Sequence, residues 1–152
     1  MEFDEFEVLL HDAQAKYAGG RVPEGLRLFD SLRASDQDLD HVESGLAVSL
    51  PKKYREFMKR HGGGQFLFID LLPAISKEGR RKDLLIVNSD ASLRGKFVAV
   101  APVGTGDWWG FSVADGKCKE SVDFLFHEDG LIEEGRNDFL EFLSKQALRV
   151  GS

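Results

Sequence analysis

The side chains best suited to metal or acid–base chemistry are scattered along the chain. They are four histidines and one cysteine: His11, His41, His61, Cys118 and His127. None has a His or Cys partner at the spacing that metal-binding motifs use. The run His127-Glu128-Asp129 resembles half of a metal site, but adjacent charged residues at a strand end are more typical of a solvated turn. The sequence therefore predicts no metal site.

The segment Gly104-Thr105-Gly106-Asp107 is glycine-rich and follows an apolar stretch. It lacks the third glycine of the dinucleotide-binding fingerprint and the Lys-Ser/Thr pair of a phosphate-binding loop. A strand is expected after it rather than a helix, so no helix N-terminus would be available to hold a phosphate. We expect a turn between two strands and no cofactor.

The single cysteine, Cys118, is the strongest candidate for a nucleophile. It lies between Lys117 and Lys119, whose charges would lower the pKa of the thiol if all three side chains were close. It also follows Asp115-Gly116, which is a strong hairpin-turn signal. That position favours an exposed residue without a catalytic partner.

Two groups of carboxylates could in principle perform general acid–base catalysis. They are Asp36, Asp38 and Asp40, and the pair Glu133 and Glu134. A general acid needs a raised pKa, which usually comes from burial in an apolar pocket, and no such pocket is indicated around either group. We therefore expect no hydrolase, nuclease or transferase activity, and no enzyme.

The charge is distributed unevenly over a chain of net charge −6. Residues 1–50 carry 4 Lys or Arg and 11 Asp or Glu, residues 51–100 carry 11 and 5, and residues 101–152 carry 5 and 10. An acidic protein is a poor non-specific binder of nucleic acid. It suits a basic protein partner, because complementary fields steer the encounter. The simpler alternative is that the acids only keep a small domain soluble.

A chain of 152 residues corresponds to one domain. No apolar run approaches the ~18–20 residues that span a bilayer. The start, residues 1–7, is acidic where a signal peptide would be basic and then apolar. A single cysteine also leaves no partner for an internal disulfide. These features predict a cytoplasmic protein that does not bind membranes.

The hydrophobic periodicity changes from helical to strand-like along the chain. Helices are expected over residues 2–17, 35–45, 51–61 and 138–148, and strands over residues 65–72, 96–103, 108–114 and 121–126. In residues 21–34, Leu26, Leu28 and Leu32 could alternate in a short strand or a helix could begin after Pro23, and helix or irregular structure is favoured. Residues 83–93 fit either a buried strand or a helical turn. Helices followed by a strand meander and a closing helix predict an α+β fold with an antiparallel-rich sheet.

The adjacent tryptophans Trp108 and Trp109 should point to opposite faces of their strand. Trp109 would share an apolar face with Phe111 and be buried. Trp108 would share the other face with Gly110 and Ser112, where a partly exposed ring would be a platform for a partner. The alternative, that the N-terminal segment covers Trp108, remains open.

Four segments in order resemble the SUKH superfamily. They are residues 40–64, with Glu43, Leu50-Pro51, Tyr54 and a terminal run of three glycines; residues 97–101 followed by 104–109; residues 122–127; and residues 139–143. The resemblance covers about residues 36–145. His61 stands where the family usually has Asn, and residues 1–35 match no known pattern.

The resemblance implies an α+β domain with helices packed mainly on one face of a curved sheet, and no catalysis. Bacterial members are chiefly immunity proteins that bind and neutralise a cognate toxin, often a nuclease. Fungal members are interaction modules in cell-wall signalling. The small chain fits an immunity protein with a basic toxin domain as partner. The candidate partner-binding residues are Thr105, Asp107, Trp108, His127 and Glu128.

Two alternatives to the immunity function remain. One is a regulatory or scaffold module that has no toxin partner. The other is a small-ligand-binding or enzymatic domain that uses the region around Asp107 and His127. A concave pocket that holds a carboxylate of perturbed pKa would favour this second alternative.

Overall fold

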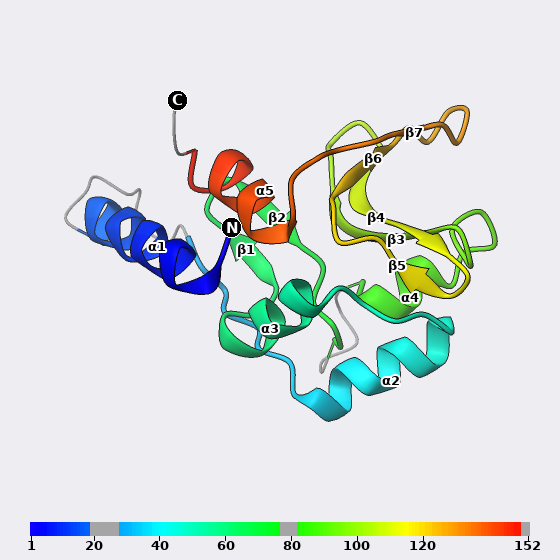
Figure 1. Ribbon diagram of the computed structural model, residues 1–152, viewed down its shortest axis with the longest axis horizontal. Coiled ribbons are helices and arrows are strands. Elements are labelled where there is room, and N and C mark those ends of the chain that lie inside the picture. Colours follow the sequence, from blue (N-terminus) through cyan, green and yellow to red (C-terminus); the bar gives the residue numbers. More distant parts are fainter. Residues whose placement is uncertain (19–27, 77–81, 150–152) are drawn as a thin grey trace.

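The computed structural model describes residues 1–18, 28–76 and 82–149. In chain order the elements are α1 (Phe3–Ala18), α2 (Asp36–Leu46), α3 (Lys52–Arg60), β1 (Gly64–Phe66), β2 (Ile69–Leu71), α4 (Leu84–Asn88), β3 (Phe97–Pro102), β4 (Trp108–Ala114), β5 (Lys117–Cys118), β6 (Asp123–Leu125), β7 (Ile132–Glu133) and α5 (Phe139–Gln146) (Figure 1). The four expected helices are all present. Within the described ranges, no helix combines the length and the apolar character needed to cross a bilayer.

The strands form two antiparallel sheets. β1 and β2 make a hairpin of their own. The main sheet has the strand order β3-β4-β6-β7, and the short β5 pairs with the far end of β4. Figure 1 shows this main sheet as a strongly bent layer, with α4 beside β3 and α5 beyond the connection from β7. The predicted α+β fold with an antiparallel, curved sheet is confirmed.

Side chains that accept backbone hydrogen bonds begin α2, α4 and α5. The Ser35 hydroxyl accepts from the Asp38 N–H at 3.0 Å, and the Asp38 carboxylate accepts from the Ser35 N–H at 3.0 Å. This reciprocal pair satisfies two donors at the start of α2. Asp83 begins α4 in the same manner by accepting from the Ile86 N–H at 2.8 Å. Residues 83–93 therefore start as a helix rather than as a strand.

The segment expected to be one strand over residues 65–72 is instead a tight hairpin. Leu67 adopts a φ of 50°, in the left-handed region, and this reverses the chain between β1 and β2. Phe68 at the turn is 47% exposed. In the segment 21–34, residues 21–27 lie outside the described residues. Phe29 and Leu32 form single antiparallel bridges with Phe66 and Gly63, which agrees with irregular structure.

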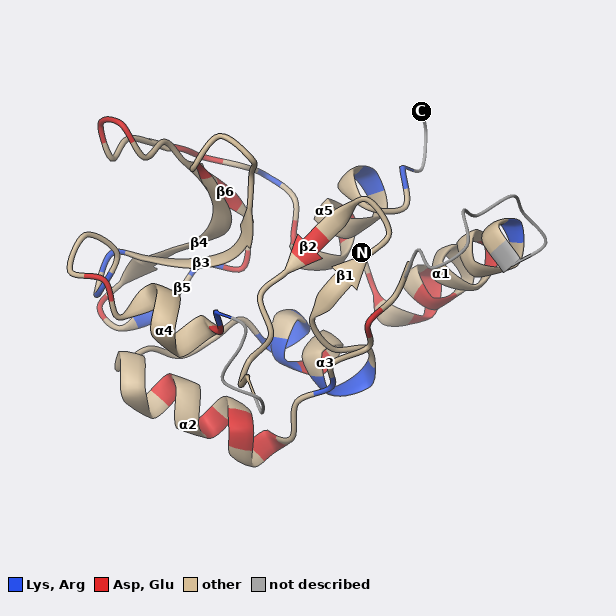
Figure 2. Ribbon diagram, turned by 180° about the vertical axis from the view of Figure 1, so that it is seen from behind, with Lys and Arg blue, Asp and Glu red and all other residues tan. Residues whose placement is uncertain are grey.

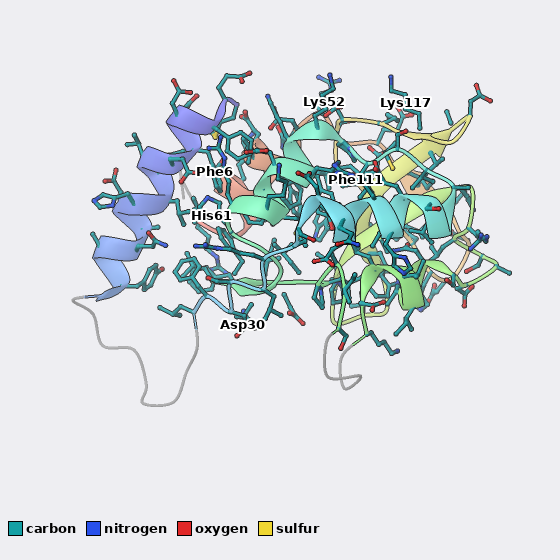
Figure 3. All side chains as sticks on the ribbon, turned by 90° about the horizontal axis from the view of Figure 1, so that it is seen from below. Phe6, Asp30, Lys52, His61, Phe111 and Lys117 are labelled. Carbon is teal, nitrogen blue, oxygen red and sulfur yellow. The ribbon has the colours of Figure 1, made fainter. Side chains whose placement is uncertain are left out.

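The main apolar core is a single cluster that joins the helices to both sheets. Phe57 of α3 lies at its centre, in edge-on ring contact with Phe6 of α1, Phe66 of β1 and Phe139 of α5. Figure 3 shows Phe6 directed towards His61 at the end of α3, and their ring centroids are 6.2 Å apart. α1, which the family resemblance did not include, is therefore packed into the core.

The basic residues of α3 pair with acids of the neighbouring elements. Arg55 contacts three carboxylates of α2, namely Asp36, Asp40 and Glu43. Lys53 contacts Asp138 at the start of α5 at 2.9 Å. Glu43 also accepts the Leu50 N–H at 2.7 Å and so holds the chain just before Pro51. The charges of Lys53, Arg55, Lys59 and Arg60 are thus paired with acids within the fold.

Candidate functional site

The turn between β3 and β4 is joined to the start of the β6–β7 hairpin through one carboxylate, Asp107. It accepts from the Thr105 hydroxyl at 2.6 Å and from the His127 backbone N–H at 2.9 Å, and it lies 2.7 Å from the His127 Nδ1. These hydrogen bonds from Thr105 and His127 lower the pKa of Asp107 to about 2. The carboxylate is therefore ionised at neutral pH, in a state suited to binding a cation rather than to donating a proton.

Gly106 makes the close approach of the two loops feasible. Its φ is 93°, which L side chains rarely adopt, and a Cβ at this position would lie 3.3 Å from the His127 ring. Thr105, Asp107 and His127, which are separated by up to 22 positions in the sequence, therefore meet at one end of the main sheet. Glu128 follows directly and is exposed.

Trp108 is partly buried, and its surroundings differ from the expected small and polar face. It pairs with Leu125 across β4 and β6, and it packs against the cluster of Leu93, Phe97, Ala99 and Leu125. This second apolar cluster fills the face that was expected to be a shallow platform. The ring is part of the packing of the sheet.

Trp109 is only partly buried, whereas Phe111 is fully buried. Trp109 lies at the margin of the core, against Phe124 and Phe142. We expect Trp108→Ala and Trp109→Ala each to lower the free energy of unfolding by about 1–3 kcal/mol, less than a fully buried aromatic residue would cost. Urea denaturation of both variants measures this. If Trp108→Ala left the free energy of unfolding nearly unchanged, Trp108 would instead be the exposed platform that the sequence suggested.

A line of aromatic rings that the sequence did not predict lies on the Trp109 face of the sheet. Phe142 of α5, Trp109 of β4, Phe124 of β6 and Phe126 follow one another with centroid distances of 5.1, 4.7 and 4.9 Å. The exposed fraction rises from 3% at Phe142 to 39% at Phe126. Leu131, which is 64% exposed, lies opposite Phe126 in the hairpin and accepts its N–H at 2.9 Å. We call Trp109, Phe124, Phe126 and Leu131 the aromatic stripe.

The signal for the aromatic stripe was present in the spacing of the two phenylalanines. Phe124 and Phe126 are two residues apart, so in a strand they share a face. The pairing of Trp109 with Phe124 places Trp109 on that face as well. What the sequence did not contain is the position of α5, whose Phe142 contacts Trp109 but which leaves Phe126 39% exposed.

The hairpin that carries the end of the stripe is acidic. Glu128, Asp129 and Glu133 are all exposed, and none of them has an ion pair with another described residue. Figure 2 shows acidic positions along the β6–β7 hairpin and also along α1 and α2. One cation lies at the tip, where Lys96 Nζ donates to the Gly130 carbonyl at 3.2 Å. The three exposed acids outnumber this single lysine, so the hairpin carries a net negative charge.

Asp36, Glu133 and Glu134 are exposed and so lack the burial that usually raises the pKa of a general acid. Asp36 lies beside Lys59 and Arg55, whose hydrogen bonds lower its pKa. Asp123, which is fully buried, accepts from the Ser112 hydroxyl and from the Gly135 N–H at 2.8 Å, and it ties the hairpin to the sheet. Among the described residues no group of three or more His, Cys, Asp or Glu side chains is placed to hold a metal ion.

The expectation of an exposed Cys118 is wrong. Cys118 is 4% exposed, because it pairs with Val113 in the β4–β5 hairpin and faces the core. Burial raises the pKa of its thiol to about 12, with smaller contributions from the charges of Glu43 and Glu120. The two flanking lysines therefore do not activate it.

We expect Cys118 in the native protein to resist thiol reagents at pH 8, since both burial and the raised pKa keep it protonated and covered. In urea the same residue should react at the rate of a free cysteine. Labelling with a chromogenic disulfide measures both rates. Rapid labelling without denaturant would show that the β4–β5 hairpin opens readily.

Comparison with known proteins adds one finding. A family model described as SMI1-KNR4 cell-wall, of the SUKH_6 group, matches residues 36–143. The match runs from the start of α2 into α5, and it includes Thr105, Asp107, Trp108, His127 and Glu128. No curated protein matches the chain.

Proposed function

The chain belongs to the SMI1-KNR4 cell-wall family of SUKH domains, and from this membership we propose that it is a non-catalytic protein-binding domain that neutralises a cognate bacterial toxin. The proposed partner is a toxin domain with a basic surface. The proposed contact region is the end of the main sheet at Thr105, Asp107, Trp108, His127 and Glu128.

The observation that carries this proposal is that acids at that end of the sheet are exposed and have no ion pair with a described residue. Asp36, Asp40 and Glu43 of α2 are paired with Arg55 and Lys59, so part of their negative charge is neutralised within the fold. Glu128 and Asp129 are exposed and have no ion pair with a described residue, and they flank the ionised Asp107. A basic partner would be attracted to this region and would replace water around it.

The test uses the product of the gene adjacent to that of this protein. Co-expression of the two chains should restore growth that the adjacent product alone inhibits, and the two should co-purify. The association rate constant should fall as salt rises, because exposed charges are screened beyond ~8–10 Å at physiological ionic strength. Binding without any growth inhibition would favour a regulatory or scaffold module instead.

Charge-reversal variants locate the contact. Glu128→Lys should slow association with the adjacent product, whereas Glu120→Lys, an equally large charge change at an exposed acid beyond the other end of β6, should not. If both variants slowed association equally, the proposed region would not be the contact site. Turnover of a nucleotide or ester that is abolished by Asp107→Asn or His127→Ala would overturn the non-catalytic role.

A further inference from the structure

The geometry points to the aromatic stripe as the surface that receives the apolar part of the partner. We infer that it binds a protein segment in which one large apolar side chain is flanked by Lys or Arg. This inference rests on the proposed function for the identity of the partner, but the surface and the chemistry it selects come from the hairpin itself.

The stripe has the features of an interface centre. Phe126 and Leu131 form an apolar cross-strand pair that is 39% and 64% exposed. Behind them Phe124 and Trp109 continue without interruption into the core at Phe142. An apolar side chain placed on Phe126 and Leu131 would therefore extend an existing packed layer. Aromatic residues, phenylalanine included, are enriched at the centre of protein interfaces relative to the rest of the surface.

The hairpin is held in place before any partner arrives. Gly130 donates to the Phe126 carbonyl at 2.9 Å, and the Leu131 N–H donates to the Asp129 carboxylate at 3.0 Å. The contact of Asp107 with His127 fixes the turn of the hairpin to the turn between β3 and β4. Binding to a preorganised surface loses less conformational entropy than binding to a mobile one.

The acids around the stripe select the chemistry of the partner. Glu133 lies opposite Phe124 in the register of β6 and β7, and Glu128 and Asp129 lie in the turn between Phe126 and Leu131. A second copy of this chain would bring two such acidic rims together, and the repulsion would oppose dimerisation. In a segment with Lys or Arg on both sides of an apolar residue, the apolar side chain would contact Phe126 and Leu131, and the basic side chains would pair with the surrounding acids.

α1 provides a matched comparison. It too carries exposed acids, Asp4, Glu5 and Asp12. Its exposed large apolar residue is Val8, at 60%, which is close to the exposure of Leu131. Neither Val8 nor Leu131 packs against the main core, but Leu131 lies opposite the exposed Phe126, whereas Val8 is the single exposed large apolar residue of α1. An acidic surface with one isolated apolar residue should not bind the same segment.

The test titrates isotope-labelled protein with the capped synthetic peptide Arg-Arg-Trp-Arg-Arg and follows the backbone amide signals. We expect the largest shifts at Phe126, Leu131 and Glu133. Leu131→Arg should weaken binding at least about fivefold, a loss of roughly 1 kcal/mol. Val8→Arg, which changes the net charge equally, should leave the affinity within about twofold of the wild type.

Two control peptides separate charge from apolar contact. Arg-Arg-Gly-Arg-Arg should bind more weakly than the tryptophan peptide, and Glu-Glu-Trp-Glu-Glu should not bind. Equal affinities of the Trp and Gly peptides, equal effects of the two variants, or shifts centred elsewhere would each overturn the inference. Dimerisation of the free protein that Leu131→Arg abolishes would overturn it as well, in favour of a second copy.

The same variants distinguish this inference from the proposed function. If the adjacent-gene product binds the wild type and Leu131→Arg equally well, the inference falls while the proposed function stands. If that product does not bind but the peptide result holds, the proposed function falls while the surface stands. Unchanged unfolding midpoints for both variants exclude loss of the fold as the cause.

Discussion

Replacing Phe57 by alanine is expected to lower the free energy of unfolding by about 3–5 kcal/mol, the usual cost of removing a buried aromatic ring. Phe57 is fully buried, and its ring lies 5.2 Å from those of Phe66 and Phe139 and 6.0 Å from that of Phe6. The substitution would open a cavity where α1, α3, β1 and α5 meet. No single neighbour can fill it, because each is fixed by a different element.

Urea denaturation followed by circular dichroism gives the value, and Phe68→Ala is the matched control. Phe68 is 47% exposed at the turn between β1 and β2, so its loss should cost less than about 1 kcal/mol. If the two variants lowered the free energy of unfolding by similar amounts, Phe57 would not be a central packing residue of the core.

Replacing Asn88 by alanine is expected to cost about 2–4 kcal/mol, because each unsatisfied buried polar group costs about 1–3 kcal/mol. Asn88 is 1% exposed. Its side-chain amide donates to the Ala99 carbonyl at 2.9 Å, and its oxygen accepts the Ala99 N–H at 2.7 Å. The side chain thus takes the place of a neighbouring strand beside β3. Alanine would leave both backbone groups of Ala99 without their partner.

Asn88→Asp tests the same hydrogen bonds in another way. It retains the acceptor for the Ala99 N–H but places a carboxylate against the carbonyl oxygens of Leu84 and Ala99. Burial beside these oxygens raises the folded-state pKa of the new carboxyl above its unfolded value. The cost relative to wild type should therefore be smaller at pH 4 than at pH 7. Asn137→Ala, at a partly exposed site, should cost little at either pH.

The parts of the fold with strong local signals could be predicted from the sequence. Ser35 and Pro51 mark the starts of α2 and α3, and Asp115-Gly116 marks the hairpin after β4, because caps and turns depend on residues close in the chain. The reversal at Leu67 was missed, since its left-handed conformation is imposed by the pairing of β1 with β2.

The candidate site was predicted in part for a similar reason. Antiparallel pairing of β4 with β6 brings Asp107 and His127 together, and the order of the predicted strands already suggests this. The burial of Cys118 and the open face of Phe126 depend on which layer covers each side chain. That is a property of the packed structure, and an alternating pattern does not contain it.

The hydrogen bonds of Asn88 also bear on how the protein behaves at high concentration. The outer edge of β3 is occupied where Asn88 holds Ala99 and where the Val100 carbonyl accepts the Leu72 N–H at 2.8 Å. The opposite edge, β7, spans only Ile132–Glu133 and is followed by the exposed Glu134. Covered, short and charged edges discourage strands of separate molecules from pairing. Both margins of the main sheet are therefore poor templates for aggregation, which leaves the side chains of the hairpin rather than its backbone as the means of association.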